Sequence, residues 1–258
     1  MTQSPPDAPS SARIYNYFLG GTDHYLIDRE AGDTFLAHRP TVKAAARANR
    51  GFMLRAVKAL ADAGIDQFLD IGAGLPLAPN VHDVARTVHA DARVVYVDAD
   101  PTVVSYCKAL TRQPGISSLL GDVRDPAEIL LHAAGFLDLS RPVGLIAVAV
   151  MHFVPEDEAG AYLAQLRDAL APGSYLALSH ACNAFVPPKD VKAAQALYQQ
   201  TSDPVRIRSL EEITALFDGW SVLDPGLVPV AEWRPVENDL FPDHAVENVA
   251  GVGILTRR

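Results

Sequence analysis

The chain has 258 residues, of which 49% are hydrophobic and 21% are charged, values that suit a globular protein with one large domain. Its 31 acidic and 22 basic residues give a formal charge of −9, which repels phosphate backbones and argues against a nucleic-acid partner. Cys107 and Cys182 imply no disulfide framework, so a cytoplasmic location is expected. The longest apolar run, 143–154, is too short to span a bilayer, and no membrane partner is expected.

The N-terminal quarter of the chain is predicted to be helical after a short leader. Residues 1–11 are polar and rich in Pro and Ser, which is typical of a disordered segment. Residues 12–65 are expected to form a helical lid or extension, since Ile14, Tyr17 and Phe18 share one helical face. In the C-terminal part of this segment, a stretch rich in Ala, Leu and Lys favours a long helix.

From residue 66 to residue 258, expected strands alternate with expected helices. The strands are 67–71, 93–98, 116–120, 143–151, 174–180, 220–224 and 249–256. The helices are 79–89, 101–112, 126–134, 156–170, 189–200 and 209–217. This alternation predicts a doubly wound α/β fold with a mostly parallel seven-stranded sheet. No helix is expected between the last two strands, so the last strand is predicted to be antiparallel.

Acidic residues follow three successive expected strands, at the edge where such sheets bind ligands. Asp70 precedes a glycine loop, Gly72–Gly74, which lets the backbone approach a ligand closely. Asp98 can accept hydrogen bonds from two ribose hydroxyls. Asp122 can accept from the exocyclic amine of adenine, while the amide of Val123 donates to a ring nitrogen. Singly, each could be a turn or a helix cap; together they favour a pocket for an adenosine with an uncharged or cationic tail.

The glycine loop departs from the dinucleotide pattern G-x-G-x-x-G. Leu77 stands where the third glycine would be, and Pro76 and Pro79 disrupt the tight entry into a helix. Asp70 would repel a pyrophosphate but suits a sulfonium or an ammonium group. A nicotinamide-dependent oxidoreductase is therefore a disfavoured alternative.

The order D-x-G-x-G, Asp98 and Gly121-Asp122 over residues 66–258 resembles the class I S-adenosylmethionine (SAM)-dependent methyltransferases. The segments ARIYNYFLGGTDHYLIDREAG, NRGFMLRAV and QFLDIGAGLP are similar to the actinobacterial S-adenosyl methyltransferase family formerly described as a domain of unknown function. The resemblance implies a Rossmann-like fold, SAM as the cofactor and methyl transfer by in-line displacement, without a metal.

The resemblance also implies which residues bind SAM. They are Tyr15, Tyr17, Gly21, Arg50, Asp70, Gly72, Ala73, Gly74, Asp98, Ala99, Asp122, Val123, Val150 and Met151. The glycine loop would pass beside the methionine part, with Ala99 near the adenine. The tyrosines either belong to a lid over SAM or pack within a helix. Arg50 either pairs with the methionine carboxylate or is a solvated helix cation.

His152 follows the fourth expected strand and is the best candidate for a catalytic base, although a hydrogen-bonded pocket histidine is the competing interpretation. No NPPY-like tetrad stands in that place, so the methyl acceptor is expected to be a small molecule. Residues 183–208 are expected to cover the acceptor site or to form a solvated connecting helix. A non-catalytic SAM-binding protein is the second hypothesis, and the sequence leaves a homodimer open.

Overall fold

The structure is a computed structural model that describes residues 8–110, 112–154, 158–185, 205–237, 239–241, 243 and 247–256. Its centre is one sheet in the order β3-β2-β1-β4-β5-β8-β6, with β7 paired to β8. The strands are β1 (Gln67–Ile71), β2 (Arg93–Asp98), β3 (Ile116–Leu120), β4 (Gly144–Val148), β5 (Tyr175–Ala181), β6 (Ser221–Val222), β7 (Val228–Pro229) and β8 (Asn248–Ile254). The first five strands are mutually parallel, and β8 is antiparallel to β5. The predicted fold class is therefore confirmed.

The last edge of the sheet differs most from the prediction. The strand expected at 220–224 is reduced to β6, and β7 continues the pairing along the same edge of β8. Between them lies Pro225, which has no N–H to donate to a sheet ladder. The fourth strand also ends early, at Val148, because Ala149 takes a left-handed φ of 56° that interrupts the extended backbone.

The helices described are α1 (Ser11–Leu19), α2 (Leu26–His38), α3 (Val42–Asp62), α4 (Val81–Ala85), α5 (Pro101–Leu110), α6 (Pro126–Ala134), α7 (Ala159–Asp168) and α9 (Leu210–Ala215), with a 3-10 turn η1 (Met151–Phe153). Helix α4 is shorter than the predicted 79–89: it begins after its N-cap Asn80, whose N–H donates to Asp83 Oδ2 over 2.8 Å, and residues 86–88 form turns. The helix predicted at 189–200 lies outside the described residues.

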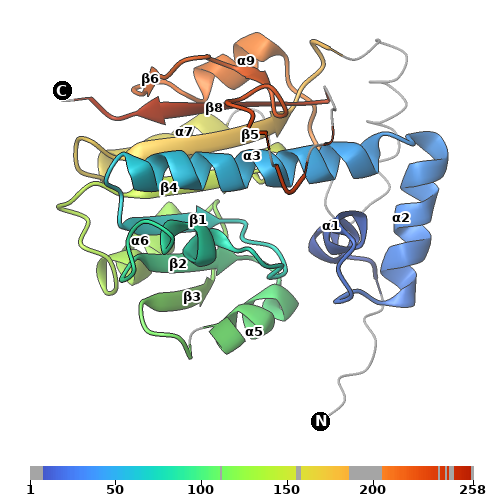
Figure 1. Cartoon of the computed structure of the whole chain (residues 1–258), viewed down its shortest axis with the longest axis horizontal. Helices are drawn as coiled ribbons and strands as arrows, with labels where there is room; N and C mark the ends of the chain where they lie inside the picture. Colours follow the sequence, from blue (N-terminus) through green and yellow to red (C-terminus); the bar gives the residue numbers. More distant parts are fainter. Residues whose placement is uncertain are drawn as a thin grey trace.

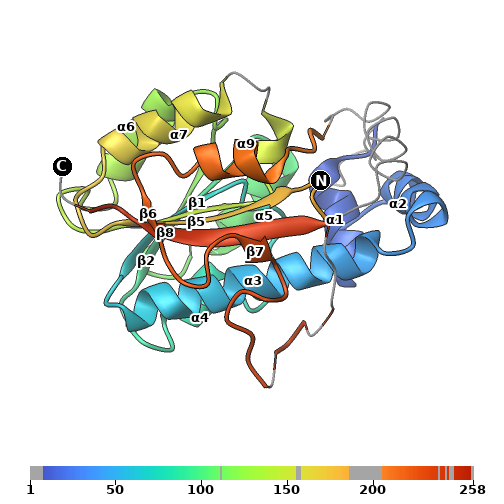
Figure 2. The same ribbon diagram turned by 90° about the horizontal axis from the view of Figure 1, so that it is seen from above.

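Helices cover both faces of the sheet (Figure 2), and alternate side chains of a strand bury against the two helical layers. On β2, Val94 and Tyr96 join the core with α3, α4 and α5, whereas Val95 and Val97 join the core with α6, α7 and α9. Both faces of the sheet are thus covered, as a parallel sheet requires.

Helices α1 and α2 lie beside one end of the sheet (Figure 1) and pack on the first half of α3 through a separate apolar cluster. The second half of α3 packs on the sheet itself. Helix α3, which belongs to the segment predicted as a lid, therefore packs both on α1 and α2 and on the sheet. Of the residues 1–11 predicted to be a leader, Ser10 is fixed as the N-cap of α1, and its N–H donates to Asp28 over 3.0 Å. None of the described helices is both long and apolar enough to cross a membrane.

Candidate active site

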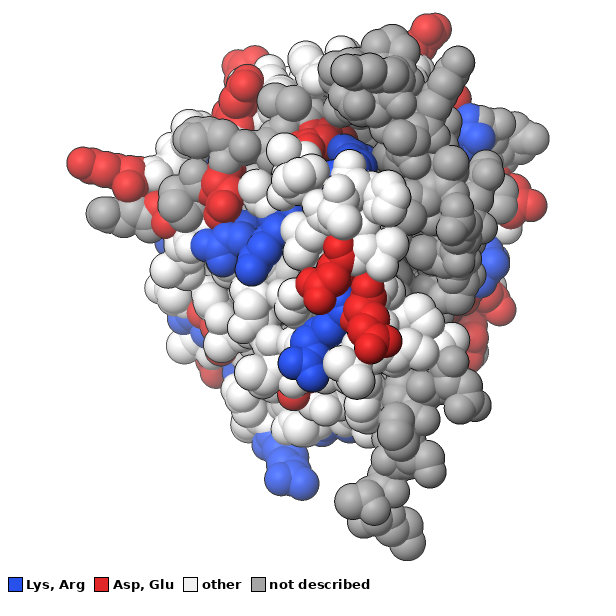
Figure 3. All heavy atoms as spheres, turned by 90° about the vertical axis from the view of Figure 1, so that its right-hand side faces the viewer, with Lys and Arg blue, Asp and Glu red and all other residues white. Residues whose placement is uncertain are grey.

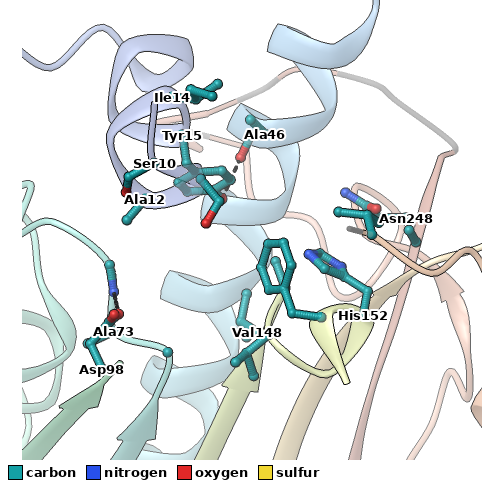
Figure 4. A pocket seen from close by; sticks show the side chains of 18 of the residues that line it. Ser10, Ala12, Ile14, Tyr15, Ala46, Ala73, Asp98, Val148, His152 and Asn248 are labelled. Atoms are coloured by element: carbon teal, nitrogen blue, oxygen red, sulfur yellow. Dashed lines mark hydrogen bonds between the residues drawn. The ribbon is translucent and has the colours of Figure 1, made fainter. Parts of the chain in front are cut away.

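A cavity of about 720 Å³ lies between the carboxyl ends of β1 to β4 and helices α1 to α3 (Figure 4). The predicted residues that line it are Tyr15, Arg50, Asp70, Gly72, Ala73, Gly74, Asp98, Ala99, Asp122, Val123, Val150 and His152. Residues of the N-terminal helices and residues that follow the strands therefore line the same cavity. Its volume lies in the upper half of the range of about 300–1,000 Å³ that is common for small-molecule sites.

The glycine loop after β1 needs both of its glycines. Gly72 has a φ of 68°, and a Cβ there would lie 2.6 Å from Cγ2 of Val150. Gly74 has a φ of 65°, and its N–H donates to Asp98 Oδ2 over 2.8 Å. These positions favour glycine because other residues are strained at such φ values. The loop is thereby locked against both β2 and the segment after β4.

Asp98 is fixed at the end of β2 by backbone donors. Besides Gly74, the N–H of Asp100 donates to Asp98 Oδ1 over 2.9 Å. Burial is the largest influence on the carboxyl and raises its pKa, while these backbone hydrogen bonds oppose that rise. An ionised carboxylate has about four acceptor sites, so lone pairs remain for two further donors from the cavity.

The adenine-reading pair predicted after β3 also lies at the cavity. Arg124 forms an ion pair with Asp122, and its hydrogen bonds to that carboxylate lower the pKa of Asp122. Among the described residues, no group accepts a hydrogen bond from the amide of Val123. This amide is therefore available as a donor to a ligand.

Arg50 and Asp70 place one cation and one carboxyl on the cavity wall. Nη2 of Arg50 donates to the carbonyls of Leu77 (2.6 Å) and Pro79 (2.9 Å), whereas its buried Nε has no partner in the described part of the chain. Burial raises the pKa of Asp70 to about 7, with Arg50 opposing this shift and Asp98 adding to it. Arg50 is therefore not on the solvated face of its helix.

The lid residues divide into two groups. The Tyr15 hydroxyl is buried beside the cavity and donates to the carbonyl of Ala46 over 2.9 Å. Tyr17, two residues further along the same helix, faces α2 and donates to Asp33 over 2.7 Å. Gly21 lies against the amide group of Asn16. Tyr17 and Gly21 thus do not line the cavity, which corrects their predicted place nearest to SAM.

The segment after β4 presents alternate residues to the cavity. Val150 packs on Gly72, and His152 faces the cavity. Met151 is fully buried in the core that contains α6, α7 and α9, because the η1 turn directs its side chain away from the cavity. Its predicted place in the cavity wall is corrected accordingly.

His152 lies beside a buried group formed by Arg208, His180 and the η1 turn, which no sequence motif indicated. Arg208 Nη1 donates to the carbonyl of Met151 (2.9 Å) and to Nε2 of His180 (2.6 Å), and Nη2 donates to the carbonyl of Val154 (2.9 Å). Arginine has only donors, so His180 carries its proton on Nδ1, which donates to Ala181. Burial, then His180, then Arg208 hold the pKa of His152 well below its ordinary value, so the imidazole is neutral.

Three further hydrogen bonds link the lid internally and to the strand ends. Ser10 Oγ donates to Asp100 Oδ2 over 2.8 Å, two residues after Asp98. Asn49 Nδ2 donates to the Tyr15 hydroxyl (3.0 Å), and its Oδ1 accepts from Ser179 Oγ (2.5 Å). These partners lie 90, 34 and 130 residues apart, and a single sequence holds no local signal that pairs them.

The strand order, the antiparallel β8 and the glycine loop at the cavity define a SAM-dependent methyltransferase of class I fold. Human N-acetylserotonin methyltransferase in complex with SAM shares this fold at a TM-score of 0.52 with 15% identity, over 96% of this chain and 64% of that one. The chain belongs to the S-adenosyl methyltransferase family, whose model matches residues 3–256.

Two crystal structures resemble almost the whole chain. One is a candidate methyltransferase from Thermobifida fusca YX, with 37% identity over 97% of this chain and 96% of that one and a TM-score of 0.89. The other is a DUF574 family protein from Streptomyces avermitilis MA-4680, with 38% identity over 96% and 98% and a TM-score of 0.88. Among curated proteins, none is significantly similar to the sequence. The predicted activity and cofactor are confirmed at the level of the family.

Proposed function

We propose that the cavity binds SAM across the ends of β1, β2 and β3 and that the methyl group passes to a small-molecule acceptor. The observation that carries this proposal is that the residues after four successive strands line one cavity together with Arg50. In the proposed complex Asp98 accepts from the ribose hydroxyls, and Asp122 and Val123 contact the adenine edge. Arg50 and Asp70 face the carboxylate and the ammonium group of the methionine part.

The residues fit such a ligand by charge and by available hydrogen-bonding groups. Arg50 brings a buried guanidinium and Asp70 a carboxyl to the same wall, which suits a zwitterionic amino-acid group. The Val123 amide supplies a donor that nothing in the described chain occupies. When bound, SAM supplies an electrophilic methyl group on a sulfonium, and the protein mainly contributes position and exclusion of water.

An acceptor of small size is supported by the enclosure of the cavity and by its charge. Helices α1 to α3 cover the side opposite the strand ends. On the face formed by α1 and α2, acidic and basic side chains lie next to one another among uncharged atoms, and the coloured residues form no continuous basic patch (Figure 3). Together with the net charge of −9, this face gives no support for a nucleic-acid partner. Both cysteines are free and buried, in keeping with a reducing cytoplasm.

Calorimetry with SAM, S-adenosylhomocysteine and NAD tests this proposal. We expect both S-adenosyl ligands to bind and NAD not to bind. Asp98→Asn should weaken S-adenosylhomocysteine binding by about 1–3 kcal/mol, roughly 5- to 150-fold in Kd. Asp66→Asn is a matched control, because Asp66 lies before β1, at the opposite end of the sheet, and pairs with Arg141 there. Unchanged affinity in Asp98→Asn would contradict the ribose assignment.

Turnover separates the enzyme from a non-catalytic SAM-binding protein. Incubation with methyl-labelled SAM and panels of small molecules should transfer the label to at least one acceptor in the presence of the wild-type chain. Tight S-adenosylhomocysteine binding without any transfer across broad panels would favour the non-catalytic alternative.

A further inference from the structure

The half of the cavity that faces away from the strand ends is apolar. Helices α1, α2 and α3 contribute Ile14, Phe18, Phe35, Val42, Ala46 and Met53 to its wall. Each of these side chains is at most 9% exposed, and most belong to the apolar cluster that unites the three helices. Phe153 and Ile207 line the cavity from the segments after β4 and before α9. A ligand in this half exchanges water for hydrocarbon contact, which favours apolar molecules.

The charges around this half are already compensated. Arg39, at the end of α2, lies 3.6 Å from Glu247, just before β8, and both line the cavity. The other charged groups of the wall lie on the SAM side of the cavity as proposed above, or on the contact between α1 and Asp100. Within the described residues, an acceptor with its own formal charge therefore finds no counter-ion in the apolar half, and its desolvation would be uncompensated.

His152 brings a polar ring to this part of the cavity, where Asn248 lies beside it (Figure 4). It is 9% exposed, and its ring packs edge-on against Phe153 with centroids 4.4 Å apart. The buried Nδ1 has no hydrogen-bond partner in the described part of the chain. A neutral imidazole offers one donor and one acceptor nitrogen. Since the pKa of His152 is held well below its ordinary value, its acceptor nitrogen is not protonated near neutral pH.

The position of this imidazole is set before any ligand arrives. Arg208 donates to the carbonyl of Met151, the first residue of η1, and to that of Val154, just after the turn, and the backbone N–H of Arg206 donates to the carbonyl of His152 over 2.7 Å. A pre-organised acceptor loses little entropy when it binds a donor. His152 can therefore discriminate between ligands that do and do not carry an O–H or N–H.

We propose that the methyl acceptor is an uncharged, predominantly apolar molecule whose hydroxyl or amine donates a hydrogen bond to His152. This inference rests on the proposed SAM site, because it assigns the acceptor to the rest of the same cavity. In the transfer step a lone pair of the acceptor oxygen or nitrogen forms the new bond to the methyl carbon. The carbon–sulfur bond breaks with its electron pair remaining on sulfur. The acceptor's proton, which is hydrogen-bonded to His152 as the new bond forms, is released to solvent.

Binding of model acceptors to the protein saturated with S-adenosylhomocysteine tests the proposal. The molecules are 2-naphthol, its methyl ether 2-methoxynaphthalene, and the anion 2-naphthoate, which share one ring system. We expect 2-naphthol to bind at least tenfold more tightly than either of the others. Tighter binding of 2-naphthoate, equal binding of the ether, or no binding of 2-naphthol to the saturated protein would overturn the proposal. Failure of S-adenosylhomocysteine itself to bind would instead overturn the proposed SAM site.

Variants assign the discrimination to the named residues. His152→Phe should reduce the preference for 2-naphthol over its ether to about twofold or less, whereas His152→Gln, which keeps an acceptor oxygen, should retain part of it. Val42→Thr, a nearly isosteric polar change in the wall, should weaken both neutral ligands and leave S-adenosylhomocysteine affinity unchanged. A preference that persists in a folded His152→Phe protein would contradict the role of His152.

Discussion

At the scale of single residues, the site depends on ionisable groups held in unusual surroundings. Asp70 is almost fully buried. The Arg50 cation lowers the pKa of its carboxyl, and the Asp98 carboxyl raises it. Burial dominates and raises its pKa from 3.8 to about 7. The free protein therefore holds this carboxyl partly protonated at neutral pH, whereas an ammonium group in the cavity favours the ionised form.

The affinity for SAM should consequently rise with pH between about 6 and 8, and binding should release a fraction of a proton near pH 7. Calorimetry in buffers of different ionisation enthalpy measures this release. Asp70→Asn should remove the dependence over this range and lower the affinity at pH 8. A proton uptake on binding, or an unaltered pH dependence in Asp70→Asn, would contradict this assignment.

The same shift predicts how stability changes with pH. Because the folded pKa of Asp70 lies above the unfolded one, the stability that this group contributes is complete below about pH 4 and is lost as the pH rises through about 7. The ligand-free Asp70→Asn protein should therefore be more stable than wild type at pH 8, by about 1 kcal/mol or more. Urea unfolding at pH 8 measures the difference, and an Asn variant that is less stable there would refute the shift.

A glycine in the loop supplies a second prediction at this scale. Gly72→Ala places a Cβ 2.6 Å from Val150 Cγ2 at a φ of 68°, so it should destabilise the protein by roughly 2 kcal/mol or more. Gly160→Ala is the matched control, since Gly160 lies within α7 with open space around its Cα, and it should stabilise the helix by up to about 1 kcal/mol. Thermal unfolding of both variants compares them; similar melting temperatures would count against the strain.

At the scale of elements, a buried hydrogen-bond chain holds the lid to the sheet. It runs from Tyr15 on α1 through Asn49 on α3 to Ser179 on β5, whose Oγ also accepts from the N–H of Ala149 over 3.0 Å. Ala149 is the left-handed residue at which β4 gives way to the segment that carries His152. The lid and the candidate catalytic segment therefore share one set of polar partners.

Tyr15→Phe should destabilise the protein by about 1–2 kcal/mol, because it leaves the buried amide of Asn49 without its acceptor. Tyr17→Phe, which removes an exposed hydroxyl bonded to Asp33, should change stability by no more than about 0.5 kcal/mol. Urea unfolding of the two variants measures both effects. Equal effects of the two changes would show that the hydrogen-bond chain has no special role.

At the scale of the whole molecule, the features with a local signal were predictable and those made by distant partners were not. The parallel strands, the glycine loop after Asp70 and the strand-end Asp98 follow from short motifs, because apolar runs and glycines report on their own surroundings. Helical periodicity did not separate Tyr15 from Tyr17, which lie about 200° apart on α1, because both helical faces carry apolar residues. Arg208 had no motif at all: its partners on η1 and β5 come together only in the folded chain.

The crystal structure of the complex with S-adenosylhomocysteine tests the central claim most directly. We predict the ribose hydroxyls within about 2.6–3.2 Å of the Asp98 carboxylate, with the adenine edge at Asp122 and the amide of Val123. The carboxylate of the amino-acid part should lie beside Arg50, and the apolar half of the cavity next to His152 should stay open for the acceptor. A ligand seated outside the cavity, or with its adenosine against the wall of α1 to α3, would contradict the account.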